Sequence, residues 1–228
     1  MEAGERATCL NAHPWFAPQR VLHNASLSDF NTEAIQKHGG LDAAVALLAE
    51  EGAQAPARGA AADLLYTAST QASVRAHIAR VLADRGALPA LLSLAKLLGD
   101  QRPSPSMLRS LCAMSLALLA QCCVEKPVQA ALRAGAGELA GELWGTLRAC
   151  MGSGVADAVQ EQACSAVGNA CTDAALLASA AGDEGLVSAL VHGLKGATLS
   201  GSGSVRAALA ALSNLLLDSS ALAPAFKR

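Results

Sequence analysis

One short pattern of small apolar residues around a single asparagine occurs twice in this chain, 45 residues apart. The first copy, residues 159–173, reads VQEQACSAVGNACTD, and the second, residues 205–218, reads VRAALAALSNLLLD. Aligning the two copies places Asn169 on Asn214, with small apolar residues at matching positions. A pattern that recurs at this distance is typical of repeat proteins, in which each unit packs mainly on its neighbours.

The first copy has the periodicity of an amphipathic helix. Val159, Ala163, Ala166, Val167 and Ala170 fall at i, i+4, i+7, i+8 and i+11, so they share one helical face. Most of these side chains are small, and small residues on a buried face allow neighbouring helices to approach closely. The stripe therefore predicts close packing between successive units.

Composition extends the helical prediction to the whole chain. Of its 228 residues, 52% are hydrophobic but only 3% are aromatic, and 16% are charged, against roughly 25% in ordinary globular domains. Alanine and leucine, both good helix formers, supply most of the apolar content, whereas residues that favour strands are scarce. The predicted fold class is all-α.

A glycine between a short helix and a longer leucine-rich helix is the most regular landmark of the repeat. It recurs at intervals of 46, 51 and 48 residues, at Gly40, Gly86, Gly137 and Gly185. Glycine reaches the left-handed conformation at little steric cost, so these residues are expected to lie at equivalent bends that end the short helices.

Each leucine-rich helix is followed by a loop that contains Gly, Pro or Ser, and then by a third, longer helix. Ser106 and Ser204 are expected N-caps, because a serine hydroxyl can accept a hydrogen bond from an amide of the first turn. The long helices are expected at about Pro56–Thr70, Pro105–Val124, Val155–Thr172 and Ser204–Ser219.

Three helices in each unit, with a glycine after the first, resemble the armadillo repeat. The resemblance covers Ser28 to Asp218 and is strongest in the last two units, where the glycine-leucine pattern and the third-helix motif A-x-x-[AL]-x-x-N both occur. It implies a right-handed α-solenoid of about four armadillo-like three-helix repeats. Two-helix units of the HEAT type are the alternative, because the short first helix could merge with its predecessor.

The chain is expected to have three parts. Residues 1–27 form an N-terminal arm or cap in which Trp15 and Phe16 cover the first repeat, with a disordered arm or a docking motif as alternatives. Residues 28–219 form the armadillo-like solenoid. Residues 220–228 look like the start of an incomplete further repeat, so the last unit either continues into a longer solenoid or is covered by a partner or by self-association.

The armadillo resemblance also implies a binding surface. Armadillo proteins commonly bind extended peptides along the concave surface lined by their third helices, and some hold the peptide backbone there with asparagine. By this resemblance Asn169 and Asn214 are candidate partner-binding residues, since a carboxamide offers a donor and an acceptor to a peptide group. Gln162 and Ser165 would extend the polar strip beside Asn169, and Arg206 would add charge near Asn214.

A structural role is the alternative for the two asparagines, in which each bonds the neighbouring loop. If they bind a ligand instead, alanine at either position is expected to weaken binding and leave the fold intact.

Approximate alignment places Tyr66 and Leu119 at the equivalent positions of the first two units. The importin-α branch of the family has Trp four residues before such an Asn, where this chain has Ser165 and Ala210, so recognition of basic nuclear-localisation peptides in that manner is not expected.

The predicted function is a non-enzymatic protein–protein interaction module that binds an extended or helical segment of another protein along the concave third-helix surface. A structural or scaffold segment of a larger α-solenoid protein is the alternative.

Other function classes lack their sequence signals. The net charge of -2 and the lack of a basic stripe argue against a nucleic-acid partner. The longest apolar run, residues 111–124, is shorter than the ~18–20 residues of a membrane span. The cysteines and histidines contain no C-x-x-C pair or ligand-spaced cluster, and no GK[ST] motif occurs, so we expect no metal, cofactor or catalytic residue.

The cysteines also indicate the cellular compartment. They number seven, an odd count, and lie mostly within expected helices, which fits reduced thiols. The N-terminus lacks the basic and apolar regions of a secretory signal, so the cytoplasm or the nucleus is expected. Trp144, beside the leucine stripe of its middle helix, is expected in the core between units.

Overall fold

The computed structural model describes residues 28–96, 105–134, 137–152, 154–196 and 203–217. These residues form twelve α-helices and, within these ranges, no strand, which confirms the all-α prediction. The arm predicted at residues 1–27 and the partial repeat predicted at residues 220–228 lie outside the described residues. The helices are Asp29–Lys37 (α3), Gly40–Ala49 (α4), Ala55–Ser69 (α5), Ala72–Asp84 (α6), Leu88–Lys96 (α7), Pro105–Cys122 (α8), Lys126–Arg133 (α9), Glu138–Cys150 (α10), Asp157–Ala170 (α11), Ala174–Gly182 (α12), Glu184–Gly196 (α13) and Gly203–Leu217 (α14).

The helices follow one another in sets of three, and the last helix of each set is long. These four long helices, α5, α8, α11 and α14, begin and end within two residues of their predicted limits. Short turns at residues 70–71, 123–125 and 171–173 separate each long helix from the short helix that follows. The merging on which two-helix units would depend is therefore not seen in the described chain.

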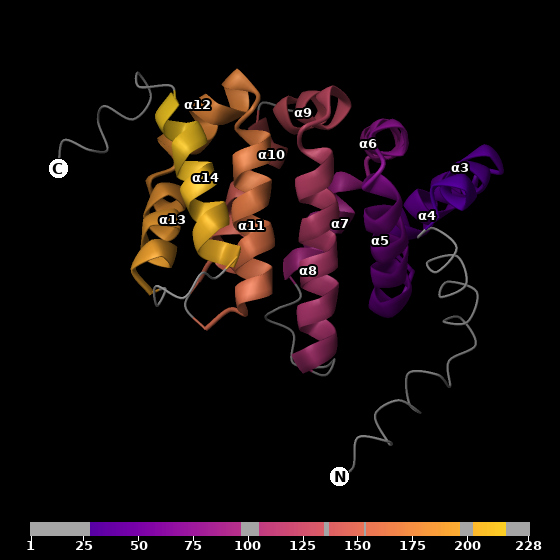
Figure 1. Cartoon of the computed structure of the whole chain (residues 1–228), viewed down its shortest axis with the longest axis horizontal. Helices are drawn as coiled ribbons and strands as arrows, with labels where there is room; N and C mark the ends of the chain where they lie inside the picture. Colours follow the sequence, from indigo (N-terminus) through magenta and orange to yellow (C-terminus); the bar gives the residue numbers. More distant parts are fainter. Residues whose placement is uncertain (1–27, 97–104, 135–136, 153, 197–202, 218–228) are drawn as a thin grey trace, which may run out of the picture.

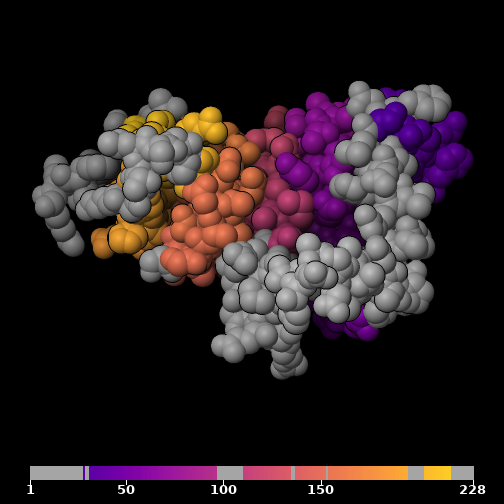
Figure 2. Space-filling view, turned by 60° about the horizontal axis from the view of Figure 1, so that its bottom comes forward, coloured from indigo at the N-terminus to yellow at the C-terminus, as the bar shows by residue number. Residues whose placement is uncertain are grey.

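The sets are arranged one after another along the long axis of the molecule (Figure 1). Each long helix contacts the next long helix, and the middle helices α4, α7, α10 and α13 and the first helices α3, α6, α9 and α12 form two similar rows. The sequence order runs from one end of the molecule to the other in the space-filling view as well (Figure 2). Equivalent helices of successive units are therefore neighbours.

Small residues bring the last two long helices into close contact. All five residues of the predicted apolar stripe on α11 are fully buried. A Cβ atom added to Gly168 would lie 3.4 Å from the Cα atom of Ala211 on α14, in ordinary van der Waals contact, so the backbones of the two helices lie close together there. The predicted close packing is observed here.

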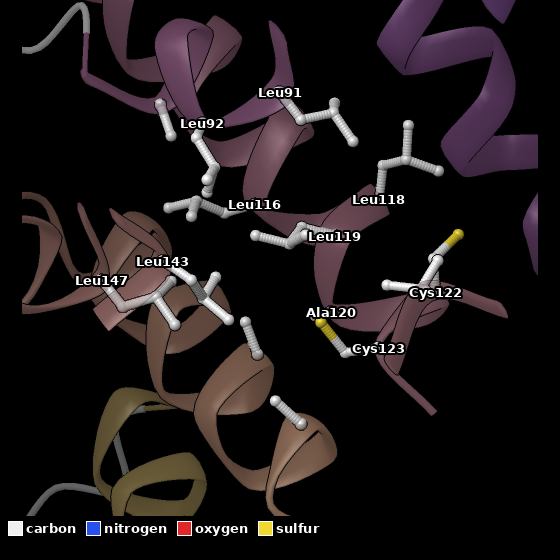
Figure 3. Packing of buried hydrophobic residues seen from close by; sticks show 14 of the residues in the cluster. Leu91, Leu92, Leu116, Leu118, Leu119, Ala120, Cys122, Cys123, Leu143 and Leu147 are labelled. Carbon is white, nitrogen blue, oxygen red and sulfur yellow. The ribbon is translucent and has the colours of Figure 1, made fainter. Parts of the chain in front are cut away.

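The core is continuous through the units, with leucine as its main large residue (Figure 3). Trp144 on α10 is only 2% exposed, and its indole N–H donates a hydrogen bond to the hydroxyl oxygen of Ser179 on α12 at 3.0 Å. The predicted location of this tryptophan, in the core between units, is correct.

Two of the four expected glycine bends are wrong in detail. Gly86 and Gly137 have positive φ angles of 62° and 84°, but in the first unit the residue with positive φ is Gly39, at 75°, and Gly40 begins α4. In the fourth unit Gly185 lies inside α13, and the carboxylate of Asp183 accepts a hydrogen bond from the amide of Leu186 at 2.9 Å. A carboxylate at the helix start thus replaces the glycine bend there.

The expected serine N-caps are also wrong. Pro105 begins α8 and Gly203 begins α14, so Ser106 and Ser204 lie inside the first turns of their helices. The hydroxyl of Ser204 instead donates to the carboxylate of Asp157 at the start of α11. This hydroxyl therefore joins two adjacent long helices.

Ion pairs connect successive units on the side of the first helices. Arg75 on α6 contacts Glu125, the N-cap residue of α9, at 2.9 Å, and Arg133 on α9 contacts Asp173, the N-cap residue of α12. Partly exposed pairs of this kind contribute about 0.2–1 kcal/mol each, so they align units more than they stabilise the fold.

No single helix of the described ranges has both the length and the apolarity that a membrane crossing requires.

The cysteines of the described chain are buried, and several carry a raised pKa. Burial raises the pKa of Cys123, Cys164 and Cys171 to about 12 each. The neutral thiol is thus favoured in the folded state, as expected for core residues. The six cysteines are Cys112, Cys122, Cys123, Cys150, Cys164 and Cys171.

We expect these thiols to resist iodoacetamide in the folded protein and to react when denaturant is added. Because the thiolate is the reactive form, labelling of the unfolded chain should be far faster than labelling of Cys123, Cys164 or Cys171 in the folded chain at both pH 7 and pH 9. Peptide-resolved mass spectrometry measures this. Rapid stoichiometric labelling of Cys164 or Cys171 in the native protein would contradict the buried assignment.

Candidate functional site

A groove crosses the four long helices and contains most of the predicted site residues. It is open to solvent and has a volume of about 340 Å³. The groove is lined by residues of α5, α8, α11 and α14. Their side chains are mostly small or carry an uncharged polar group. The lining residues are Tyr66, Ala120, Gln121, Gln162, Cys164, Ser165, Gly168, Asn169, Ala207, Ala210 and Asn214.

Each of the two asparagines bonds the long helix that precedes its own. The side-chain nitrogen Nδ2 of Asn169 donates to the carbonyl oxygen of Ala120 at 2.8 Å, and that of Asn214 donates to the carbonyl oxygen of Gly168 at 2.9 Å. A carbonyl oxygen can only accept, so it is the amide nitrogen of each side chain that faces the preceding helix. The repeated sequence motif therefore corresponds to a repeated contact.

The accepting carbonyls are those that a helix end leaves without a partner. The last four carbonyl groups of an α-helix have no amide donor within the helix. In the last turn of α8, the carbonyl of Leu119 accepts from the backbone amide of Cys123, and in α11 the carbonyl of Val167 accepts from the amide of Cys171. Ala120 and Gly168 come next in their chains, and their carbonyl groups are satisfied from the following unit by Asn169 and Asn214.

The first unit satisfies its equivalent carbonyl locally. Counting back five residues from the N-cap residue of the next short helix gives Tyr66 in α5, just as it gives Ala120 and Gly168 in the next two units. The carbonyl oxygen of Tyr66 accepts a hydrogen bond from the hydroxyl of Ser69 at 2.7 Å. The carbonyl group of Tyr66 therefore has a donor without a side chain from the next unit.

The same count corrects the alignment of the first two units. The residues equivalent to Asn169 are Thr67 and Gln121, so the expected equivalents Tyr66 and Leu119 are wrong by one and two positions. The apolar pattern of a helix can be aligned in more than one register, whereas the number of residues to the next helix start gives a single alignment. Gln121 is thus a groove residue that the sequence reasoning missed, and counting from the next helix start could have found it.

The other predicted site residues are only partly brought together. Gln162 and Ser165 lie on α11, are half-buried and line the groove beside Asn169. Arg206 is exposed near the start of α14, beside the lining residue Ala207, and is not itself among the lining residues, so a contribution of its charge to the site stays a prediction.

The groove offers hydrogen bonds but no activated nucleophile. Within the described chain, the carboxamide oxygens of Asn169 and Asn214 accept no hydrogen bond, and the side chains of Gln121 and Gln162 form none. The thiol of Cys164 also lines the groove, but burial holds its pKa at about 12, which keeps it neutral. Among the described residues, no group of three or more His, Cys, Asp and Glu is placed to hold a metal ion.

Both asparagines thus have a structural bond and a remaining hydrogen-bonding capacity. The structural alternative expected this bond to go to a neighbouring loop. It goes instead to the end of the preceding long helix. The expectation that alanine at either position leaves the fold intact is therefore replaced by an expected loss of stability.

No protein-family model and no curated protein matches the chain. Among solved structures, it is similar to the crystal structure of an engineered protein, a target of the Northeast Structural Genomics Consortium, with a TM-score of 0.64 and 22% sequence identity. The alignment covers 87% of this chain and 72% of that chain. At this level of identity the likeness concerns the fold alone.

Replacing Asn169 or Asn214 with alanine should lower the free energy of unfolding by about 1–3 kcal/mol, because each change leaves a helix-end carbonyl without its donor. Gln162→Ala, in the same groove but without a hydrogen bond to lose, should leave it nearly unchanged. Urea unfolding followed by circular dichroism measures all three. Equal stabilities for the asparagine variants and Gln162→Ala would show that these two bonds do not support the fold.

Proposed function

We propose that this chain is a right-handed solenoid of four armadillo-like units that acts as a non-enzymatic interaction module. It binds a segment of another protein in the groove across α5, α8, α11 and α14. The observation that carries the proposal is that all four long helices contribute to one groove, in which Asn169 and Asn214 lie at equivalent positions with unused acceptor oxygens. We assign this activity to the cytoplasm or the nucleus.

The armadillo assignment is supported by the helices in threes and by the glycines at the start of middle helices. Positive φ angles at Gly39, Gly86 and Gly137 recur one or two residues before three successive middle helices. A left-handed residue there turns the chain sharply between the first and the middle helix.

A second role is favoured by the exposed face of the last helix. Leu209 and Leu216 on α14 are 51% and 50% exposed, and they lie seven residues apart on the same helical face. The residues 45 positions earlier, Cys164 on α11 and Cys171 at the C-cap of α11, are 4% and 5% exposed. A further unit packed on α14 would cover the two leucines, which supports a scaffold segment of a larger solenoid as the alternative function.

To test the groove, Ser165→Tyr would fill it with an uncharged side chain. In proximity labelling, the signal of a set of partners should fall about fivefold or more in this variant relative to wild type. A loss of about 1 kcal/mol in binding free energy already lowers the affinity by about this factor. Ser188→Tyr, on the exposed side of α13, is the matched control and should retain the same partners. Equal thermal melting of the two variants excludes an effect of unfolding.

Retention of every partner by Ser165→Tyr would contradict the groove proposal. If those partners were lost instead by a Leu209→Glu, Leu216→Glu double variant, the scaffold alternative would replace it.

A further inference from the structure

Two buried thiols from different units meet at the end of one helix. Cys112 lies on α8 of the second unit, and Cys150 is the last residue of α10 in the third unit. Their side chains are 0% and 1% exposed. The Sγ atom of Cys112 lies 2.6 Å, and that of Cys150 lies 3.7 Å, from the carbonyl oxygen of Ala95 in the last turn of α7. The fold therefore holds two sulfur atoms together at the boundary between two units.

A contact between the two thiols changes the acidity of Cys150. The side chain of Cys112 forms a hydrogen bond with Cys150 that lowers the pKa of Cys150, whereas burial acts in the opposite direction. Burial raises the pKa of Cys123 and of Cys171 to about 12. Because the thiolate is the form that attacks an oxidant, Cys150 is better prepared for oxidation than these two cysteines.

We propose that Cys112 and Cys150 form a reversible oxidation site, in which hydrogen peroxide converts the two thiols into a disulfide that joins α8 to α10. The thiolate of Cys150 attacks one oxygen atom of the peroxide, the O–O bond breaks, and the hydroxide that leaves takes up the proton that Cys150 has lost. The sulfur of Cys112 then attacks the sulfur of the Cys150 sulfenic acid, and the S–O bond breaks as the S–S bond forms. The thiol proton of Cys112 leaves with the departing hydroxide as water. Two thiols are thereby oxidised by two electrons, and one peroxide is reduced to two molecules of water.

The position of the pair at helix ends gives the oxidant a route. Ala95 and Cys150 both lie in the last turn of a helix, and helix ends open locally more often than helix centres. Hydrogen peroxide occupies little more space than a water molecule, so a brief opening admits it. Iodoacetamide is larger, which is why the same buried thiols are expected to resist alkylation.

Oxidation changes what the pair does in the fold. In the reduced state the thiol of Cys112 donates to the carbonyl of Ala95, which is one of the last four carbonyl groups of α7 and so has no amide donor within that helix. A disulfide has no S–H group, so this hydrogen bond is lost, and a covalent bond between the second and third units takes its place. The bond fixes the position of α8 relative to α10, and a reducing thiol restores the original contact.

The test is to treat the folded, reduced full-length chain with an equimolar amount of hydrogen peroxide and then block the remaining thiols with iodoacetamide in denaturant. Fragmentation of the linked peptides by mass spectrometry identifies the bonded cysteines. A link between Cys112 and Cys150 should form at least about tenfold faster than any other link, and dithiothreitol should reverse it. The matched control Cys123→Ala, a buried cysteine also at the end of α8, should keep the link.

Two further variants separate the roles of the two thiols. In Cys112→Ala the sulfenic acid of Cys150 has no resolving thiol, so it should accumulate and react with dimedone. In Cys150→Ala the dimedone adduct of Cys112 should be at least about fivefold smaller. Equal adducts in the two variants would contradict the assigned order of attack.

The wild-type chain alone can overturn the proposal, so the test does not depend on the folding of the variants. If the folded chain keeps Cys112 and Cys150 reduced at a peroxide concentration that links the cysteines of the urea-unfolded chain, the pair only donates hydrogen bonds to Ala95. A link that forms first between Cys123 and Cys171 would overturn the proposal as well.

Discussion

The carbonyl groups at the end of a buried helix must find donors, and this requirement governs how the long helices stack. The next long helix covers the end of each preceding one, so water cannot satisfy every carbonyl there. Ser69 supplies a donor within its own helix, whereas Asn169 and Asn214 supply it from the following helix. In the last two contacts the donor and the carbonyl meet only at one register, so these bonds help to select the alignment of neighbouring units.

The same two side chains keep hydrogen-bonding capacity that the fold does not use. A carboxamide has two N–H donors and an acceptor oxygen, and the fold uses only one donor of Asn169 and one of Asn214. The remaining groups are exposed to the groove at equivalent points of successive units. Helices aligned in this way therefore also place the unused groups of the two side chains at a regular spacing, and α11 and α14 lie close together at Gly168.

Periodicity was enough to predict the helices but not the contacts between them. The apolar stripe and the loop residues place all four long helices within two residues of their observed limits, because both signals are local. The acceptors of the asparagines are backbone carbonyls, which leave no trace in the sequence. Gln121 was missed because the apolar pattern of the long α8 can be aligned in several registers, and Gly185 was misplaced because Asp183 begins α13 without a left-handed residue.

The central claim is that Asn169 and Asn214 join successive long helices through helix-end carbonyl groups. Nuclear magnetic resonance can detect these bonds directly, because scalar coupling passes across a hydrogen bond from the donor nitrogen to the carbonyl carbon. A long-range HNCO spectrum should connect Nδ2 of Asn169 to the carbonyl carbon of Ala120 and Nδ2 of Asn214 to that of Gly168. The claim would be contradicted if both couplings were absent and both side-chain amides exchanged with solvent as fast as those of an unfolded chain.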